Sequence, residues 1–251
     1  MACTLRQKMT IHPTRNVNLQ EIVSPNGYGA TLFVPALARF IVQYNNPQLS
    51  PQQIEERAAD IHFPFDLLPI YHRIKYWNEE IYGHETMDSI HAQPATREND
   101  GSIIKHARFD TALVNVRPNV VGINATHQNR LQGTRVGQVR VIFSLPKSAI
   151  ERFFTPSHPP PRHLAYTEWF SKFAMTPERN TGMYKVKRAT RDGDRLASIV
   201  PISLIQRSVH LLPKWGGSVP RNWSSDNVLE ECSVFYLNPF KDAHTYFNLV
   251  I

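Results

Sequence analysis

The sequence predicts an α+β fold that is mainly β, in which an N-terminal helical pair is followed by a partly open antiparallel barrel or sandwich of short strands. Apolar residues repeat at helical spacing over 33–44 and capping signals start a second helix at residue 50, whereas from residue 70 onward apolar residues alternate with polar residues over many short segments. Glycine, proline and long polar stretches separate these segments. No alternation of strands and helices continues past residue 80, so a parallel α/β sheet is not expected.

The helical pair is predicted over residues 33–60. Apolar side chains fall at helical spacing in 33–44, and the Asn-Asn-Pro sequence that follows ends this first helix. The second helix begins at Ser50, a capping residue. Pro51 suits its first helical position, and Gln53 is placed to close a capping box.

Period-two alternation predicts the strands. Between them, 93–107 and 117–135 are predicted as polar connections, and Asp192-Gly193 predicts a tight hairpin turn. Strands are expected at residues 70–77, 86–92, 109–116, 136–145, 163–170, 183–190, 195–202, 207–212 and 232–237.

We expect these elements to form one domain. Residues 1–27 are polar and rich in turn formers, which predicts a flexible lead-in before a single β-rich domain at 28–251 with a helical N-terminal part. The proline-rich stretch 156–161 predicts an exposed connector between strands. A domain boundary is not placed there, because the strands before it are too few to close a sheet.

Charge and cysteine content narrow the partners and the environment. The formal net charge of +7 and the pI of about 9.5 favour a polyanionic partner, nucleic acid first and an anionic membrane surface second. Neither an apolar run of about 18 residues nor an apolar signal segment occurs, so we expect an intracellular protein, nuclear or cytoplasmic, that does not span a membrane. The two cysteines exclude a disulfide framework and a cysteine-rich zinc site.

The sequence contains no complete catalytic constellation. It has no G-x-S-x-G, P-loop or G-x-G-x-x-G motif, and its histidines lack metal-binding spacing. Helices come first and strands later, the wrong order for a two-metal core. We therefore expect no enzyme activity, no metal and no cofactor, and we expect Asp88 and Asp110 to pair with Arg108 or His91. The carboxylates considered for a two-metal site are Asp60, Asp66, Asp88 and Asp110.

Two basic stretches are candidate nucleic-acid contacts. The first places Lys185, Lys187 and Arg191 on one strand face and leads, through Arg188, into the predicted Asp-Gly turn. A two-stranded ribbon of this shape can follow a phosphate backbone or enter a major groove. The same pattern also fits a solvated strand whose charges protect a sheet edge.

The second stretch lies in the strand predicted at 70–77. Its alternation places Arg73, Lys75 and Trp77 on one face, so that cationic contacts to phosphate combine with a ring on which a base or a duplex end stacks. Tryptophan on a strand also serves as core, and a purely structural role is the alternative.

Several phrases of the sequence resemble the C-terminal region of fungal Plavaka-type transposases, relatives of the CACTA elements. In such transposases the acidic catalytic core lies upstream of this region, so the resemblance implies a context of DNA transposition and no catalytic residue in this chain. The resemblance covers residues 60–251 and rests on HFPFDLLPIYHRIK at 62–75, RFDTALV at 108–114, RVGQVRVIF at 135–143, HLAYTEWF at 163–170, MYKV at 183–186, RSVHLLPKW at 207–215 and FYLNPFKDAHTY at 235–246.

Charge and resemblance together predict a non-catalytic DNA-associated module that positions DNA through backbone contacts or stabilises a transposase assembly. Its partners would be DNA and a full-length transposase or a chromatin protein. One alternative is a protein-interaction or chromatin-docking barrel, similar to bromo-adjacent homology modules in its many short strands and long loops. Another is a decayed transposon fragment.

Overall fold

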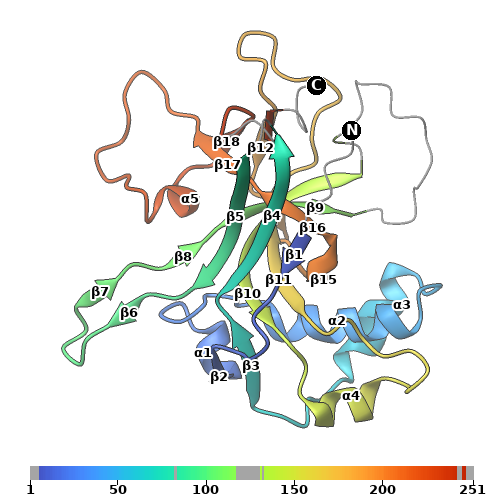
Figure 1. Cartoon of the computed structure of the whole chain (residues 1–251). Coiled ribbons are helices and arrows are strands. Elements are labelled where there is room, and N and C mark those ends of the chain that lie inside the picture. Colours follow the sequence, from blue (N-terminus) through green and yellow to red (C-terminus); the bar gives the residue numbers. More distant parts are fainter. Residues whose placement is uncertain (1–5, 82–83, 117–130, 132, 242–244, 247–251) are drawn as a thin grey trace.

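The chain folds into several antiparallel sheets with a few helices against them, as a computed structural model shows for residues 6–81, 84–116, 131, 133–241 and 245–246 (Figure 1). This confirms the predicted fold class, α+β and mainly β. Over the described residues the sheets do not close into a barrel. The helices are α1 (Leu19–Val23), α2 (Phe33–Asn45), α3 (Pro51–Ala59), α4 (Lys147–Phe153) and α5 (Val228–Glu231).

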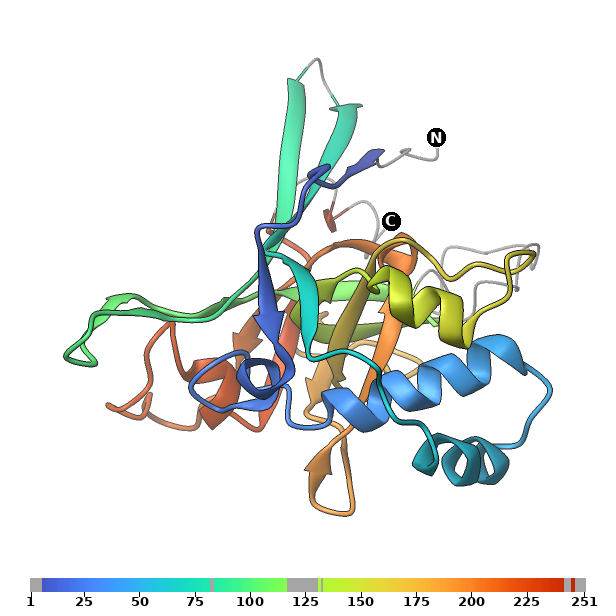
Figure 2. The same ribbon diagram turned by 90° about the horizontal axis from the view of Figure 1, so that it is seen from below.

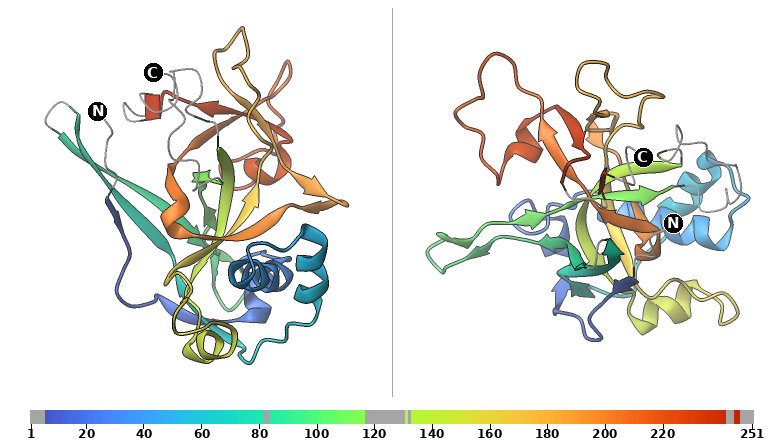
Figure 3. Two further views of the ribbon diagram at one scale, coloured as in Figure 1. Left: turned by 90° about the vertical axis from the view of Figure 1, so that its right-hand side faces the viewer. Right: turned by 45° about the horizontal axis from the view of Figure 1, so that its top comes forward.

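The largest sheet is central to the molecule. Its strand order is β15 (Ala197–Pro201), β11 (Leu164–Trp169), β10 (Thr134–Phe143), β3 (Leu67–Tyr71) and β2 (Arg15–Asn18), while β9 (Thr111–Asn115) pairs with both β10 and β16 (Ile205–Ser208). Helix α2 covers one side of this sheet, with α3 beside it (Figure 3, left). Phe33 of α2 lies edge-on to Phe143 of β10, at 5.1 Å between ring centroids.

Strand β10 is buried on both faces. A bulge between Val139 and Val141 shifts its register against β11, so Val141 and Phe143 pack under α2 while Val139 and Ile142 pack in the core on the other face. Strict alternation along the strand expected at 136–145 predicts that Val139, Val141 and Phe143 share one face. That prediction is wrong for Val139, because the inserted residue reverses the alternation.

A second sheet leaves the body of the molecule. It contains β1 (Arg6–Lys8), β4 (Arg73–Ile81), β5 (His84–Gln93) and β8 (Arg108–Phe109) in this order. Figure 2 shows the β4–β5 pair projecting from the body with β1 beside it. The single strand predicted at 70–77 is divided at His72, so β3 joins the central sheet and β4 joins this one.

Two hairpins and a smaller sheet complete the described fold. Strands β6 (Thr96–Arg97) and β7 (Ile103–Lys105) form a projecting arm within the predicted connection 93–107 (Figure 1). The connection predicted at 117–135 lies largely outside the described residues. The three-stranded sheet has the order β12 (Lys185–Lys187), β18 (Val234–Asn238) and β17 (His210–Pro213), and β13 (Thr190–Arg191) pairs with β14 (Asp194–Arg195).

Local turn and cap chemistry behaves as the sequence predicts. The Ser50 hydroxyl accepts from the backbone N–H of Gln53, whose side chain accepts from the Ser50 N–H, and Pro51 is the first helical residue. Asp192 and Gly193 adopt φ of 54° and 90°, the left-handed pair that a tight hairpin turn between β13 and β14 requires.

The segment predicted as a flexible lead-in is part of the fold from residue 6 onward. Strand β2 pairs with β3, and Val17 and Ile22 are buried in the core beneath α2. The Asn18 side chain accepts from the N–H of Gln20 and caps α1. Each of these short elements buries a single apolar residue, so neither produces a visible period in the sequence.

The proline-rich stretch 156–161 follows α4 and leads into β11. The backbone carbonyl of Pro159 accepts a hydrogen bond from the Tyr44 hydroxyl at 2.7 Å, and the Tyr44 ring stacks on His158. Strands β10 and β11 on either side of the stretch are direct neighbours in the central sheet. The connector therefore joins two adjacent strands and rests on α2.

Candidate nucleic-acid interface

The outer side of the projecting sheet carries basic side chains from two strands that are far apart in the sequence. The register places Arg6 opposite Trp77 and Lys8 opposite Lys75, while Arg73 follows on the same side of β4. Arg6, Lys8 and Arg73 are exposed, and Lys75 and Trp77 are half-buried. We call these five residues the basic face.

The opposite side of the sheet is closed by the core, which explains why the basic face points outward. Ile74, Tyr76 and Ile90 are almost fully buried. Gln7 of β1 turns inward and donates to the Tyr76 hydroxyl at 3.1 Å and to the Ile202 carbonyl at 2.8 Å. Burial raises the pKa of the Tyr76 hydroxyl well above its usual range, so this inner hydrogen-bonded group stays neutral.

An apolar strip lies within the basic face. The ammonium group of Lys8 is 5.4 Å from the centre of the Trp77 ring, a cation–π contact between β1 and β4. Met87 lies opposite Trp77 on β5 and is 58% exposed. Cations therefore flank an aromatic ring and a thioether on one accessible surface, the combination used for backbone contact and base stacking.

The basic face ends at an ion-paired group on β5 and β8. Asp110 accepts from the His91 ring at 2.9 Å and from the Arg108 guanidinium at 3.0 Å, which confirms the predicted pairing for this acid. Burial raises the pKa of Asp110, but the hydrogen bonds from His91 and Arg108 outweigh it and hold this pKa below its usual value. His91 itself lies directly opposite Arg73.

Asp88 finds different partners from those predicted. Its carboxylate accepts from the Ser208 backbone N–H at 3.0 Å, from the Ser208 hydroxyl at 2.8 Å and from Lys241 at 3.0 Å. Arg108 and His91 instead form hydrogen bonds with Asp110. Within the described ranges, no three histidine, cysteine or acidic side chains are grouped as a metal site would need.

The ribbon predicted over 184–191 is divided between two sheets. Lys185 and Lys187 are exposed on β12, which pairs with β18. Arg191 belongs to the separate β13–β14 hairpin, where it is 66% exposed and lies 3.5 Å from Glu55 of α3. The continuous basic ribbon is therefore not present, although three of its four cations are exposed.

Arg188 is buried, which corrects its placement on the exposed ribbon. The chain leaves β18 after Lys187 and forms a bridge to Phe170, so the Arg188 side chain turns inward over the Phe170 ring. It donates to the Gln138 side chain at 2.6 Å and to the Leu229 carbonyl at 2.8 Å. Burial, with a contribution from nearby positive charge, lowers the pKa of Arg188 to about 10.

Arg188 belongs to what we call the arginine–glutamate cluster: Arg140, Arg188, Arg195, Glu168 and Glu230. Glu168 is almost fully buried and lies 2.9 Å from Arg195 and 3.8 Å from both Arg140 and Arg188. Glu230 of α5 pairs with Arg140 at 3.0 Å and with Arg195. Three cations and two acids leave one uncompensated positive charge in this group.

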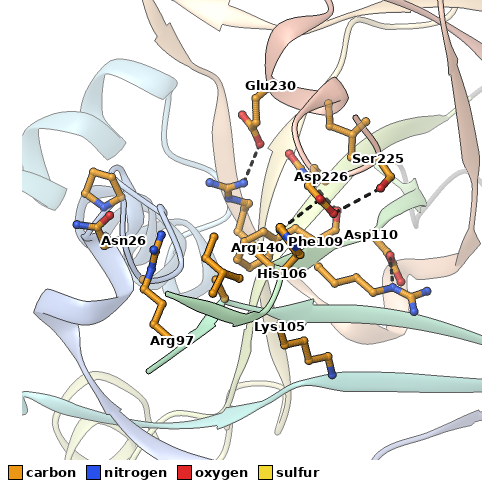
Figure 4. Close-up of a pocket in the computed structure, with 18 residues that line it drawn as sticks. Asn26, Arg97, Lys105, His106, Phe109, Asp110, Arg140, Ser225, Asp226 and Glu230 are labelled. Carbon is orange, nitrogen blue, oxygen red and sulfur yellow. Dashed lines mark hydrogen bonds and ion pairs between the residues drawn. The ribbon is translucent and has the colours of Figure 1, made fainter. Parts of the chain in front are cut away.

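Beside this cluster is a pocket of about 670 Å³, lined by the β6–β7 arm, β8, the loop at 25–27 and α5 (Figure 4). Arg140 and Phe109 contribute to its lining, with the guanidinium 4.5 Å from the centre of the ring. His106 and Asp226 also line the pocket and form an ion pair at 3.2 Å between the arm and the loop before α5.

The lowered pKa values of Glu230 and His72 predict that the fold loses stability as the pH falls. Burial raises the pKa of Glu230, but the hydrogen bond from Arg195 and the arginine charges outweigh it and lower this pKa overall, while burial and then Arg15 lower the pKa of His72. Both pKa values are depressed in the fold, so both groups stabilise it above their unfolded pKa values of about 4 and 6.5. Urea unfolding at pH 7.5, 6.0, 5.0 and 4.0 should show a steadily decreasing free energy of unfolding. Constant stability from pH 7.5 to pH 5.0 would contradict the contribution of His72.

Sequence reasoning missed two of the five residues of the basic face and did not foresee the arginine–glutamate cluster. Arg6 and Lys8 stand in the tripeptide Arg-Gln-Lys, whose alternation is too short to be recognised as a strand. Glu168 and Glu230 are distant in sequence from the arginines that they neutralise, so no pattern of neighbouring residues predicts these ion pairs.

Two further findings concern membrane-spanning helices and known proteins. None of the helices in the described part has the length and the apolar run needed to cross a membrane. Comparison with known proteins gives no matching family model, no matching curated protein and no matching solved structure.

Proposed function

We propose that this chain is a non-catalytic DNA-binding module that holds DNA against the basic face. The observation that carries the proposal is the register of β1 with β4, which adds Arg6 and Lys8 to Arg73 and Lys75 beside an accessible Trp77. Cations of this kind neutralise phosphates, and the ring offers a stacking surface that tolerates any base.

Charge and resemblance support DNA as the polyanion. A net charge of +7 favours a nucleic acid over a neutral protein surface. The similarity to the tail of Plavaka-type transposases suggests a role in positioning transposon DNA or in stabilising a transposase assembly, with the catalytic acids supplied elsewhere. A chromatin-docking role would call for a different surface, because a cage for a modified lysine needs several aromatic rings. Of the described residues lining the pocket, only Phe109 is a phenylalanine, tyrosine or tryptophan, and Arg140 lies over it.

The salt dependence of DNA binding tests this proposal. Four phosphate contacts give a slope of log K against log salt of about −3.6 on duplex DNA, so replacing Arg73 and Lys75 by glutamate should flatten the slope by about 1.8. Fluorescence anisotropy of a labelled duplex at several salt concentrations measures both values. On single-stranded DNA, Trp77→Ala should weaken binding by about 1–3 kcal/mol if a base stacks on the ring.

A matched control uses the other exposed basic strand. Lys185→Glu with Lys187→Glu changes the net charge by the same amount on β12, and we expect its slope to stay close to that of the wild type. If the β12 variant lost as much slope as the β4 variant, binding would depend on overall charge and not on the basic face. Unchanged binding by a folded Arg73→Glu, Lys75→Glu protein would overturn the proposal.

A further inference from the structure

The pocket lies directly beyond the end of the basic face. Lys105 and Arg108 both line it, and both also contact β5: Lys105 donates to the Gln93 side chain at 3.3 Å, and Arg108 is the register partner of Gln93. Strand β5 alone separates β4 from β8, and neighbouring strands are about 4.8 Å apart. A nucleic-acid strand on the basic face therefore has only a short distance to cover to reach the pocket.

The pocket has an excess of positive charge at its rim. The three acidic side chains among its lining residues already have partners: Asp110 pairs with Arg108, Glu230 with Arg140 and Asp226 with His106. Arg97 and Lys105 also line the pocket, and neither has a carboxylate partner among the described residues. Arg97 donates to the Gly101 carbonyl and Lys105 to the Gln93 amide, both neutral acceptors. The two side chains extend to different sides, Arg97 toward Asn26 and Lys105 away from Arg140 and Phe109, so Arg97 is the cation available to an anionic group in the pocket (Figure 4).

The rest of the lining suits a flat, mostly apolar group with polar edges. Ile103, Leu229 and Phe109 provide apolar surface, and Asn26 and Ser225 provide hydrogen-bonding side chains. Ligand pockets typically measure about 300–1,000 Å³, so a hollow of about 670 Å³ has room for one nucleotide.

The floor of the pocket is held rigidly. Gly29, with φ of +64°, packs so closely on Arg140 that a Cβ atom there would clash with the guanidinium group. The Phe109 ring covers the Arg140 guanidinium at 4.5 Å, and Glu230 accepts from it at 3.0 Å. A ligand therefore meets a preformed surface, and little ordering free energy opposes its binding.

We propose that this pocket binds a single unpaired nucleotide, with its phosphate at Arg97 and its base against Ile103 and Leu229. The inference rests on the proposed function in one respect: the nucleotide is the end of a DNA strand held on the basic face. Free nucleoside monophosphate has the same chemistry, and the test separates the two sources.

The test compares three ligands with the full chain. The first is a blunt duplex, the second the same duplex with a two-nucleotide overhang and the third a free deoxynucleoside monophosphate. We expect the overhang to bind at least about tenfold more tightly than the blunt end, a difference of about 1.4 kcal/mol. A 2-aminopurine base in the overhang reports on its surroundings through its fluorescence.

Variants of the arm localise the effect. Ala107→Trp fills the pocket from an exposed position and should reduce overhang binding to the blunt value, whereas Ile104→Trp adds the same ring to an exposed residue outside the lining and should change nothing. Arg97→Gln should have the effect of Ala107→Trp without adding bulk. This second variant decides the question if the tryptophan variant does not fold.

The outcomes distinguish the pocket from the basic face. Equal binding of blunt and overhanging DNA, unaffected by Ala107→Trp, would overturn the pocket and leave the proposed function standing. Binding of free monophosphate that Ala107→Trp removes, without any DNA binding, would support the pocket and overturn the DNA role. Overhang binding that survives both pocket variants would place the unpaired nucleotide elsewhere.

Discussion

Replacing Glu168 by glutamine is expected to lower the free energy of unfolding by about 3–5 kcal/mol. Glu168 lies within 4 Å of Arg140, Arg188 and Arg195, and its side chain is 3% exposed. The substitution preserves size but leaves three arginine charges with Glu230 as their only acid in the cluster. Buried like charges then repel each other in a medium that screens them poorly. Urea denaturation followed by circular dichroism gives the change.

The control is the same substitution in an exposed ion pair. Glu55 lies 3.4 Å from Arg39 and 3.5 Å from Arg191, and its side chain is 43% exposed. Exposed ion pairs contribute about 0–1 kcal/mol to the free energy of unfolding, so Glu55→Gln should leave it almost unchanged. A loss of less than about 1 kcal/mol for Glu168→Gln would show that water or rearrangement relieves the arginines.

Phe33→Ala should also cost about 3–5 kcal/mol, for a different reason. Phe33 is fully buried at the start of α2, between the rings of Phe143 and Tyr166, whose centroids lie 5.1 and 5.8 Å away. Truncation removes apolar contacts and leaves a cavity between the helix and the central sheet. Chemical denaturation should show a lower midpoint with an unchanged slope, as expected when only stability changes.

The neighbouring residue provides the comparison. Val34 is 38% exposed on the same helix, and alanine is the better helix former, so Val34→Ala should change stability by no more than about 0.5 kcal/mol. Equal losses at Phe33 and Val34 would mean that α2 is stabilised by helix propensity and not by its contact with the sheet.

The features that the sequence predicts correctly are those decided by neighbouring residues. The cap at Ser50 needs only Gln53, three positions away, and the turn at Asp192-Gly193 needs only a residue pair that accepts positive φ. Fold class follows from the same kind of information, because a period of two is visible within each strand. The outward position of Arg73 and Lys75 was predictable for this reason.

The features that the sequence does not predict depend on contacts between residues that are far apart in the chain. Val17 and Ile22 are buried only because β2 joins β3, some fifty residues later in the chain. Arg188 lies on the same side of the chain as the buried Val186, and Glu168 and Phe170, which accommodate its charge there, are some twenty residues away in the sequence. A pattern along the chain cannot contain such information. Local sequence patterns therefore do not predict the arginine–glutamate cluster, which brings together residues from 140 to 230.

The double pairing of β9 has a consequence for synthesis of the chain. Residues 111–114 of this strand are buried, and one of its two neighbours, β16, begins only at residue 205. While the ribosome makes the intervening residues, at about 5–20 per second, one edge of β9 waits unpaired for on the order of ten seconds. An apolar strand edge exposed for that long invites pairing with other chains. We therefore expect the nascent protein to need protection from such pairing until β16 has emerged.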